Sequence, residues 1–277
     1  MLRRTCFWLI LALLALPAYA SSILGSADSF GVLGGSTVTN THSTVVNGNV
    51  GVSAGSAVTG FPPGIVNDGT IHNNDAVAAQ AQSDATAAYN GLAGMTVTED
   101  LTGQDLGGLT LTPGVYQFDT SAQLTGTLTL NGEGNNNALW VFLIGSTLTT
   151  ASDSGVNVIN SGSNDGVSGS NDGIFWDVGK SATLGTTTAF EGNILASASI
   201  TLVTGSTIEC GSALASTGGV TMDTNVINIG CSGGGTITNG VVTALPNTEA
   251  TPEPSSLLLL GTGLVVLAGG VRRKLRK

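Results

Sequence analysis

Hydrophobic and polar residues alternate along much of the chain. In the stretch "SITL", Ile200 and Leu202 point to one side and Ser199 to the other, which is the two-residue period of a β-strand. Two near copies flank this stretch, "ATLG" from Ala182 and "VTMD" from Val220. The alternation predicts short strands that bury Leu, Ile, Val and Met and turn threonine outward.

A threonine followed by Leu or Met recurs at a nearly constant interval. Six such pairs begin at Thr110, Thr129, Thr147, Thr183, Thr201 and Thr221. The steps between them are 19, 18, 36, 18 and 20 residues, which is typical of a β-solenoid with about three short strands per coil. The 36-residue step is either two coils or one coil with an insertion. The prediction is a mainly β fold, an irregular β-solenoid whose stacked threonines form a flat, uncharged face.

One segment, residues 75–95, has a helical period instead. Its apolar residues are spaced by 4, 4, 3 and 4, at Val77, Ala81, Ala85, Ala88 and Leu92. This spacing places them on one helical face. Asn74 or Asp75 can serve as the N-cap, and Gly91 and Gly94 mark the C-terminal end. We expect one long helix packed alongside the solenoid.

Two segments are irregular. Residues 26–63 combine strand-like alternation with Gly and Asn turns, so they either start the solenoid or cap its end. The duplicated stretch "GSNDGVSGSNDG", residues 162–173, lies inside the 36-residue step and has Val167 as its single larger apolar side chain. We expect a surface loop there.

Composition and charge narrow the function. The chain has 277 residues with 41 Gly, 9% charged and 5% aromatic residues, which favours a turn-rich β fold. Between Ser21 and Thr248, 16 acidic residues stand against the single Lys180, a net charge of −15. Because phosphate contacts need Lys or Arg, nucleic acid is excluded as a partner.

The N-terminus is typical of an export signal. Arg3 and Arg4 precede the apolar run "CFWLILALLAL", and "AYA" at 18–20 has the form of a signal peptidase site. We predict a signal peptide over 1–20 and a mature start at Ser21, with an uncleaved anchor as the alternative.

The C-terminus combines an apolar segment with a basic end. Residues 255–271 are largely apolar and five basic residues follow, as in a short membrane segment with its basic end inside. A plain anchor is one reading. However, Pro252, Glu253 and Pro254 directly before it closely resemble the PEP-CTERM sorting signal, here residues 249–277. The resemblance implies export from a Gram-negative cell, a transient inner-membrane anchor cut by an exosortase, and a cell-surface or extracellular-matrix destination, commonly in species that make extracellular polysaccharide.

Two cysteines remain once the signal peptide, with Cys6, is removed. Cys210 and Cys231 are 21 residues apart, about one coil, so they lie nearly above one another in the solenoid. One coil spacing suits a disulfide, which is worth about 3 kcal/mol by loop closure. We expect it to pin the last coils, where a solenoid frays.

Few residues in the sequence are candidates for a catalytic or metal-binding site. Asp177, in "GIFWDVG", is a candidate glycosidase carboxylate, although Phe175 and Trp176 beside it favour a core-flanking role. His42 and His72 belong to no recognisable catalytic or metal-binding motif, so we interpret them as surface or turn residues. Asp165 and Asp172 offer hard oxygen ligands for Ca²⁺, with a solvated loop as the favoured interpretation. We therefore expect no enzyme, no metal and no cofactor.

The threonine pattern is the strongest functional signal. An ordinary exposed strand face would also use Lys, Glu and Arg, whereas these coils repeat T-[LM]-x-T four times. A flat face of hydroxyls and methyls can match ordered water or carbohydrate. The candidate face residues are Thr147, Thr150, Thr183, Thr186, Thr188, Thr201, Thr204, Thr207, Thr221 and Thr224.

The chain also resembles the microbial ice-binding proteins built on a discontinuous β-solenoid with one flanking helix. The similarity is carried by "FGVLGGSTVTNT" (30–41), "GNVGVSAGSAVTGFPPG" (48–64), "ATAAYNGLAG" (85–94), "DLGGLTLTPGVYQF" (105–118), "ALWVFLIGSTLTT" (138–150) and "TLGTTTAFEGNILASASITLVTGSTI" (183–208). The resemblance implies a domain over 21–248 of roughly triangular section, non-catalytic, with one flat face that adsorbs to ice.

In that family the ice-binding face often carries the degenerate sequence motif T-[AG]-x-[TN]. "TGST" from Thr204 fits this pattern, whereas "TASD" from Thr150 fits in part. An acid on the face, at Asp153 or Asp223, argues against strong activity. Family membership does not fix function, so adsorption to ice stands beside an alternative role in the extracellular polysaccharide matrix, structural or adhesive, with exopolysaccharide as the partner.

Overall fold

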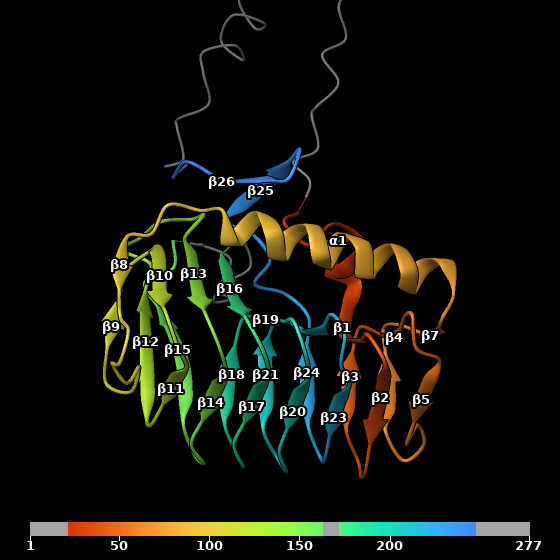
Figure 1. The fold of residues 1–277 in the computed structure, drawn as a ribbon. Helices are drawn as coiled ribbons and strands as arrows, with labels where there is room; N and C mark the ends of the chain where they lie inside the picture. The colour runs from red at the N-terminus through yellow and green to blue at the C-terminus, as the bar shows by residue number, and fades with distance from the viewer. Residues whose placement is uncertain (1–21, 163–171, 248–277) are drawn as a thin grey trace, which may run out of the picture.

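The structure is a computed structural model that describes residues 22–162 and 172–247. Within these ranges three parallel sheets wrap around a common core, and a single long α-helix lies along the outside (Figure 1). This arrangement confirms the predicted β-solenoid with a flanking helix. The expected signal peptide (1–20), the sorting motif at Pro252–Pro254 and the apolar segment 255–271 lie outside the described residues. In the part that is described, no helix has the length and apolarity needed to cross a membrane.

Sheet A is the sheet that the helix covers. In spatial order its described strands are β7 (Ile71–Asn73), β4 (Asn49–Val52), β1 (Phe30–Gly34), β22 (Ala213–Ala215), β19 (Asn193–Ala196), β16 (Gly173–Val178), β13 (Leu139–Ile144), β10 (Gly114–Phe118) and β8 (Glu99–Asp100).

Sheets B and C form the two uncovered sides. The described strands of sheet B are β11 (Ala122–Leu124), β14 (Leu148–Thr150), β17 (Ala182–Leu184), β20 (Ile200–Leu202), β23 (Val220–Met222), β2 (Thr37–Asn40) and β5 (Ala57–Thr59). Those of sheet C are β6 (Ile65–Asn67), β3 (Val45–Asn47), β24 (Val226–Asn228), β21 (Thr207–Cys210), β18 (Ala189–Glu191), β15 (Gly155–Ile159), β12 (Thr127–Asn131) and β9 (Thr110–Leu111).

The coils do not stack in chain order. Strands β22, β23 and β24, from the C-terminal part of the domain, pair with β1, β2 and β3 from its N-terminal part. The irregular N-terminal segment therefore builds one end of the solenoid and also closes the open side of the last coil. This discontinuity is the one implied by the family resemblance.

The Cys210–Cys231 disulfide is present, with 5.5 Å between the two Cα atoms. It links the end of β21 to the turn after β24. Because β24 pairs with β3 on its other side, this bond lies inside the stack. The expectation that it pins a fraying end of the solenoid is wrong.

The 36-residue step is a single coil with an insertion, because β14 pairs directly with β17. The pairing also corrects the threonine alignment: Thr149, rather than Thr147, lies beside Thr183. Thr110 and Thr129 pair with each other on sheet C. Most of the duplicated loop, residues 163–171, lies outside the described residues.

The core between the sheets is built from inward-pointing apolar side chains. Its aromatic part is a row of four rings. Tyr116, Phe142 and Trp176 stack on the adjacent strands β10, β13 and β16, with centroids 5.6 and 3.9 Å apart. Phe190 of β18, in sheet C, lies tilted against Trp176 with the centroids 4.9 Å apart. Phe142, Trp176 and Phe190 are fully buried. Parallel pairing places the three rings of sheet A one above another, and Phe190 packs against Trp176 from sheet C.

Helix α1 (Ala76–Ala93) is capped at its N-terminus by Asp75, whose carboxylate accepts a hydrogen bond from the Ala78 amide at 2.9 Å. Its buried side chains include Ala81, Ala85, Ala88 and Leu92, as predicted, but Ala78 is buried in place of Val77, which is 48% exposed. They pack on the outer side of sheet A and form a second core.

Two short elements hold the helix in place. The 3₁₀-helix η1 (Gly25–Ser29) contacts α1, where both the amide and the hydroxyl of Ser26 donate to Asp84. A hairpin of β25 (Gly235–Thr238) and β26 (Val241–Ala244), which the sequence did not predict, packs against the C-terminal half of α1.

Candidate functional site

Sheet B carries an unbroken row of threonines. Parallel pairing places one outward-facing threonine on six successive strands, in the same position each time. We call this set the threonine row: Thr149, Thr183, Thr201, Thr221, Thr39 and Thr59. Gln123 continues it at one end. Since neighbouring strands are about 4.8 Å apart, the hydroxyls and methyls repeat at a regular interval.

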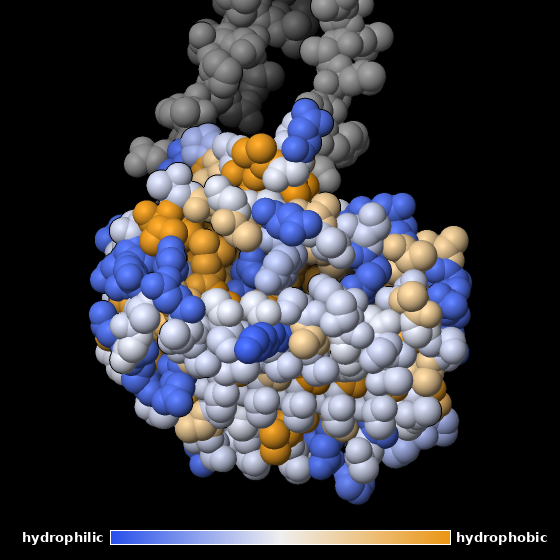
Figure 2. All heavy atoms as spheres, in the orientation of Figure 1, coloured by the Kyte–Doolittle hydropathy of each residue, from blue (hydrophilic) through white to orange (hydrophobic). Residues whose placement is uncertain are grey.

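A second row of small residues lies beside the first. It includes Thr147, whose hydroxyl donates to that of Ser121 at 2.8 Å, and Ser199, whose amide donates to the Ser181 hydroxyl at 3.3 Å. The strands of sheet B contain no charged residue. Figure 2 shows the surface below the helix as mostly pale, the colour of residues near the middle of the hydropathy scale. The face is therefore broad and nearly free of charge.

Three of the candidate threonines lie at the corner between sheets B and C. Thr186, Thr204 and Thr224 are exposed there, in the turns that follow β17, β20 and β23. They border the sheet B face but belong to no strand.

Thr150 and Thr188 are in the interior, with exposed fractions of 3% and 0%. Their hydroxyl oxygens are 2.8 Å apart, and Thr150 Oγ1 also accepts a hydrogen bond from the Gly185 amide. These side chains satisfy backbone groups of the turn, so the expectation that they contact a ligand is wrong. Thr207, by contrast, lies on sheet C, between Ala189 and Val226.

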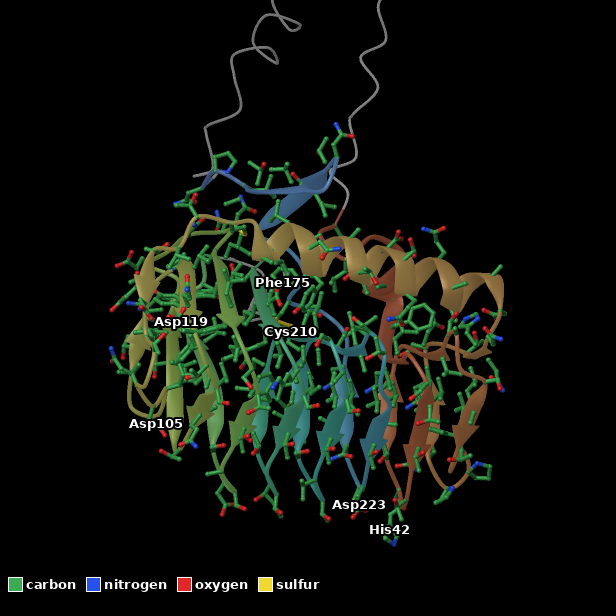
Figure 3. The ribbon with its side chains drawn as sticks, viewed as in Figure 1. His42, Asp105, Asp119, Phe175, Cys210 and Asp223 are labelled. Atoms are coloured by element: carbon green, nitrogen blue, oxygen red, sulfur yellow. A yellow bond between two sulfur atoms is a disulfide. The ribbon has the colours of Figure 1, made fainter. Side chains whose placement is uncertain are left out.

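The two acids expected on the face are at its corner. The Thr204 hydroxyl donates to Asp223 Oδ2 at 2.6 Å, and His42 Nδ1 lies 2.6 Å from Asp223 Oδ1 (Figure 3). These two contacts, Thr204 first, lower the pKa of Asp223. Asp153 accepts a hydrogen bond from Thr187 at 2.5 Å. Both carboxylates are thus held by neighbouring side chains beside the flat sheet.

Sheet C is chemically different. One of its outward rows includes Thr207, Val226, Val45 and Ile65. The next is an amide ladder in which Asn47 donates to Asn228 at 2.6 Å and Asn67 donates to Asn47 at 3.1 Å. Sheet A is covered by the helix, and sheet C mixes threonine with Val, Ile and Asn, so among the described residues the unbroken threonine row lies on sheet B.

The remaining candidates are spread over the fold. Phe175 and Trp176 are fully buried, as expected from their core-flanking role. His72 lies 2.8 Å from Asp75 Oδ2 at the start of the helix. Asp172 is buried, which raises its pKa to about 6, while Asp165 lies outside the described residues. In the described ranges, no group of three or more His, Cys, Asp or Glu is arranged to hold a metal ion.

The sequence missed half of the threonine row. An alignment on threonine followed by Leu or Met selects Thr147, whereas Thr149 is the residue that pairs with Thr183. Thr39 and Thr59 come from the N-terminal segment. The alternation in "STVTNT" could have placed Thr39 on an outward strand face. Only the pairing of β2 with β23 brings it next to Thr221.

Comparison with known proteins agrees with this architecture. Residues 32–228 match the model of the ice-binding-like family, and residues 250–274 match that of the PEP-CTERM protein-sorting motif. An ice-binding protein from Nostoc sp. (strain HG1) is 52% identical over 277 residues, covering 97% of this chain and 96% of that protein.

Solved structures show the same fold. The ice-binding protein of the Antarctic ascomycete Antarctomyces psychrotrophicus superposes with a TM-score of 0.68 at 39% identity, covering 75% of this chain and 98% of the other. An ice-binding protein from an Antarctic biological consortium has a TM-score of 0.69 at 44% identity, covering 76% and 91%. The family model spans most of the solenoid and the Nostoc relative nearly the whole chain, so this protein belongs to the ice-binding-like family.

Proposed function

We propose that this protein adsorbs to ice through sheet B and that the threonine row is the contact surface. The observation that carries the proposal is the register of six outward threonines on an uncharged sheet. Adsorption of this kind needs no catalytic group and no cofactor. The names of its relatives, which are ice-binding proteins from bacteria and fungi, support the same function.

The physical basis is the regular spacing of hydroxyls and methyls. Short β-branched side chains have restricted rotamers, so the row changes little on binding and loses little conformational entropy. A charged side chain would orient water around itself, and none stands on the strands of this sheet. The corner threonines Thr186, Thr204 and Thr224 can extend the contact at its edge.

A bulky side chain in the middle of the row tests the proposal. Thr201→Tyr on β20 should abolish ice shaping and reduce thermal hysteresis at least tenfold, because the ring holds the sheet away from a flat surface. The measurement is ice-crystal morphology and thermal hysteresis of residues 21–248, with folding checked by circular dichroism.

The matched control is Thr207→Tyr, which places the same ring on sheet C. It should retain the shaping and hysteresis of the unmodified domain. If Thr207→Tyr abolishes shaping while folded Thr201→Tyr does not, the contact surface is sheet C and the assignment of sheet B is wrong.

We also propose the route by which the protein reaches ice. Signal peptidase would cut the chain before Ser21, which becomes the new N-terminus. The apolar segment 255–271 would then anchor the chain transiently in the inner membrane until an exosortase cuts near Pro252–Pro254. The match to the sorting motif supports this route. Mass spectrometry of the protein recovered from the cell surface should find an N-terminus at Ser21 and no residues from 255–277; an intact tail would contradict the exosortase step.

A further inference from the structure

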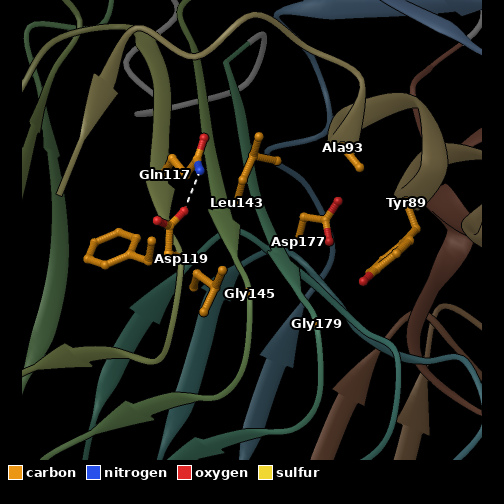
Figure 4. Close-up of a pocket in the computed structure, with 10 residues that line it drawn as sticks. Tyr89, Ala93, Gln117, Asp119, Leu143, Gly145, Asp177 and Gly179 are labelled. Carbon is orange, nitrogen blue, oxygen red and sulfur yellow. Dashed lines mark hydrogen bonds between the residues drawn. The ribbon is translucent and has the colours of Figure 1, made fainter. Parts of the chain in front are cut away.

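A pocket of about 420 Å³, lined by both polar and apolar residues, lies beside the C-terminal half of α1, on the outer side of sheet A (Figure 4). Its volume falls within the usual range for small-ligand sites. The side chains that define it are Tyr89, Gln117, Asp119, Leu143 and Asp177. None of them takes part in the threonine row, and the proposed ice contact does not use this pocket.

Strand register builds the floor of the pocket. Gln117 on β10 pairs with Leu143 on β13, which in turn pairs with Asp177 on β16. The apolar Leu143 is thus flanked by polar side chains on both sides. Two strand spacings place Gln117 and Asp177 roughly 10 Å apart, so the two ends of the floor are polar and its centre is apolar.

One wall comes from the helix. Tyr89 extends from α1 toward Asp177 and closes the pocket on that side (Figure 4). At the opposite side, the amide of Gln117 donates to Asp119 Oδ1 at 2.6 Å, which fixes that carboxylate at the pocket edge. The pocket therefore has an aromatic wall, an apolar floor and hydrogen-bond acceptors at both ends.

Asp177 has unused hydrogen-bonding capacity. The residue is 4% exposed, yet its Oδ2 atom has no hydrogen-bond partner of normal geometry among the described residues. Burial raises the pKa of Asp177 to about 7, with the Tyr89 hydroxyl acting in the opposite direction. Since a buried polar atom without a partner is costly, this carboxyl group would gain from a ligand that supplies a donor.

The lining selects among ligand classes. It contains two acids and no Lys or Arg, so phosphates, uronates and other anions are disfavoured. A ligand that fits all its parts has hydroxyl donors at its two ends and an apolar face for Leu143 and the Tyr89 ring.

We propose that this pocket binds a single neutral sugar unit of a saccharide, with Asp177 and Asp119 accepting hydrogen bonds from its hydroxyl groups and Tyr89 and Leu143 contacting its C–H face. Sheet A and sheet B are different sides of the solenoid. The saccharide and ice would therefore be bound independently, and the proposal does not rest on ice adsorption.

Isothermal titration calorimetry above 0 °C tests the proposal on the full chain, kept in solution by a zwitterionic detergent without sugar groups. The probes are maltotriose, cellotriose, mannotriose and galactotriose, with trigalacturonate and spermidine as an anionic and a cationic comparison. At least one neutral trisaccharide should bind saturably, and at least tenfold more tightly than trigalacturonate or spermidine.

Two pocket variants and two controls locate the binding. Asp177→Asn and Tyr89→Ala should each weaken the binding at least tenfold. Asp68→Asn, which removes the same charge from an exposed turn, and Thr201→Tyr on sheet B should leave it unchanged. Tyr89→Ala keeps the test informative if Asp177→Asn does not fold, since Tyr89 is only partly buried.

Three results would overturn the proposal. One is the absence of saturable binding by all four neutral trisaccharides. Another is equal binding to the unmodified protein and to both pocket variants. The third is preferential binding of spermidine, which would assign the pocket to cationic ligands instead.

Discussion

Buried carboxyl groups determine how the stability of this domain depends on pH. Burial raises the pKa of Asp177 and of Glu191 to about 7 each and that of Asp172 to about 6. In the unfolded chain these groups titrate near 4. The folded state therefore binds more protons between about pH 4 and pH 7, and its free energy of unfolding falls as the pH rises through that interval.

We predict that the domain is less stable at pH 8 than at pH 5 by a few kcal/mol, since each pKa unit corresponds to about 1.4 kcal/mol. Below about pH 4 stability falls again, because Asp84 and Asp105 are hydrogen-bonded carboxylates with lowered pKa values. Asp177→Asn cannot ionise, so it should unfold at a higher urea concentration than the unmodified domain at pH 8 and show a smaller change between pH 5 and pH 8. Equal pH dependence in both proteins would contradict this account.

At the scale of the element, the alanine face of α1 sets the distance between helix and sheet. Ala81, Ala85 and Ala88 are buried against sheet A, and added volume in a well-packed core is destabilising. We predict that Ala88→Leu lowers the free energy of unfolding by about 1–3 kcal/mol. Ala87→Leu, on the exposed side of the same turn, should change it by less than about 0.5 kcal/mol. Urea unfolding of both variants is the measurement, and equal effects would mean that packing at Ala88 is not tight.

The buried residues of α1 were largely predictable from the helical period of the sequence. Four of its five predicted buried residues are correct because they share one stripe of a 100° rotation per residue. Val77 and Ala78 lie at opposite edges of that stripe, so the period does not distinguish them. Contacts near the start of the helix decide the matter, and they bury the smaller side chain.

For the strands, the sequence pattern predicts which residues point inward but not which sheet each strand joins. Alternation predicted their inward residues, because the two-residue period is local. Which side of the solenoid a residue faces is not a local property: Thr110 and Thr129 belong to sheet C, and in the coil with the insertion Thr149, rather than Thr147, lies in the threonine row. The second threonine of the T-[LM]-x-T pattern lies beyond the strand at Thr186 and Thr204, which are at the corner, whereas Thr150 is the last residue of β14 and turns inward.

At the scale of the whole molecule, the order of coils in space differs from their order in the chain. Strands β1, β2 and β3 have neighbours on both sides: β4, β5 and β6 on one, β22, β23 and β24 on the other. Strands β5 and β6 end sheets B and C at that end of the solenoid, and β8 and β9 end sheets A and C at the other. The N-terminal coil is therefore interior, although it comes first in sequence.

This arrangement predicts the pattern of amide hydrogen exchange. Backbone amides open from the ends of a stack first, because terminal coils have a neighbour on one side only. Strands β1–β3 should thus exchange as slowly as β20 and β23 in the middle, and at least tenfold more slowly than β5, β6 and β9. Exchange followed by mass spectrometry on peptides from each coil measures this directly. A solenoid stacked in chain order would instead place β1–β3 at an end and make them exchange as fast as β9, so fast exchange there in the folded domain would refute the discontinuous pairing.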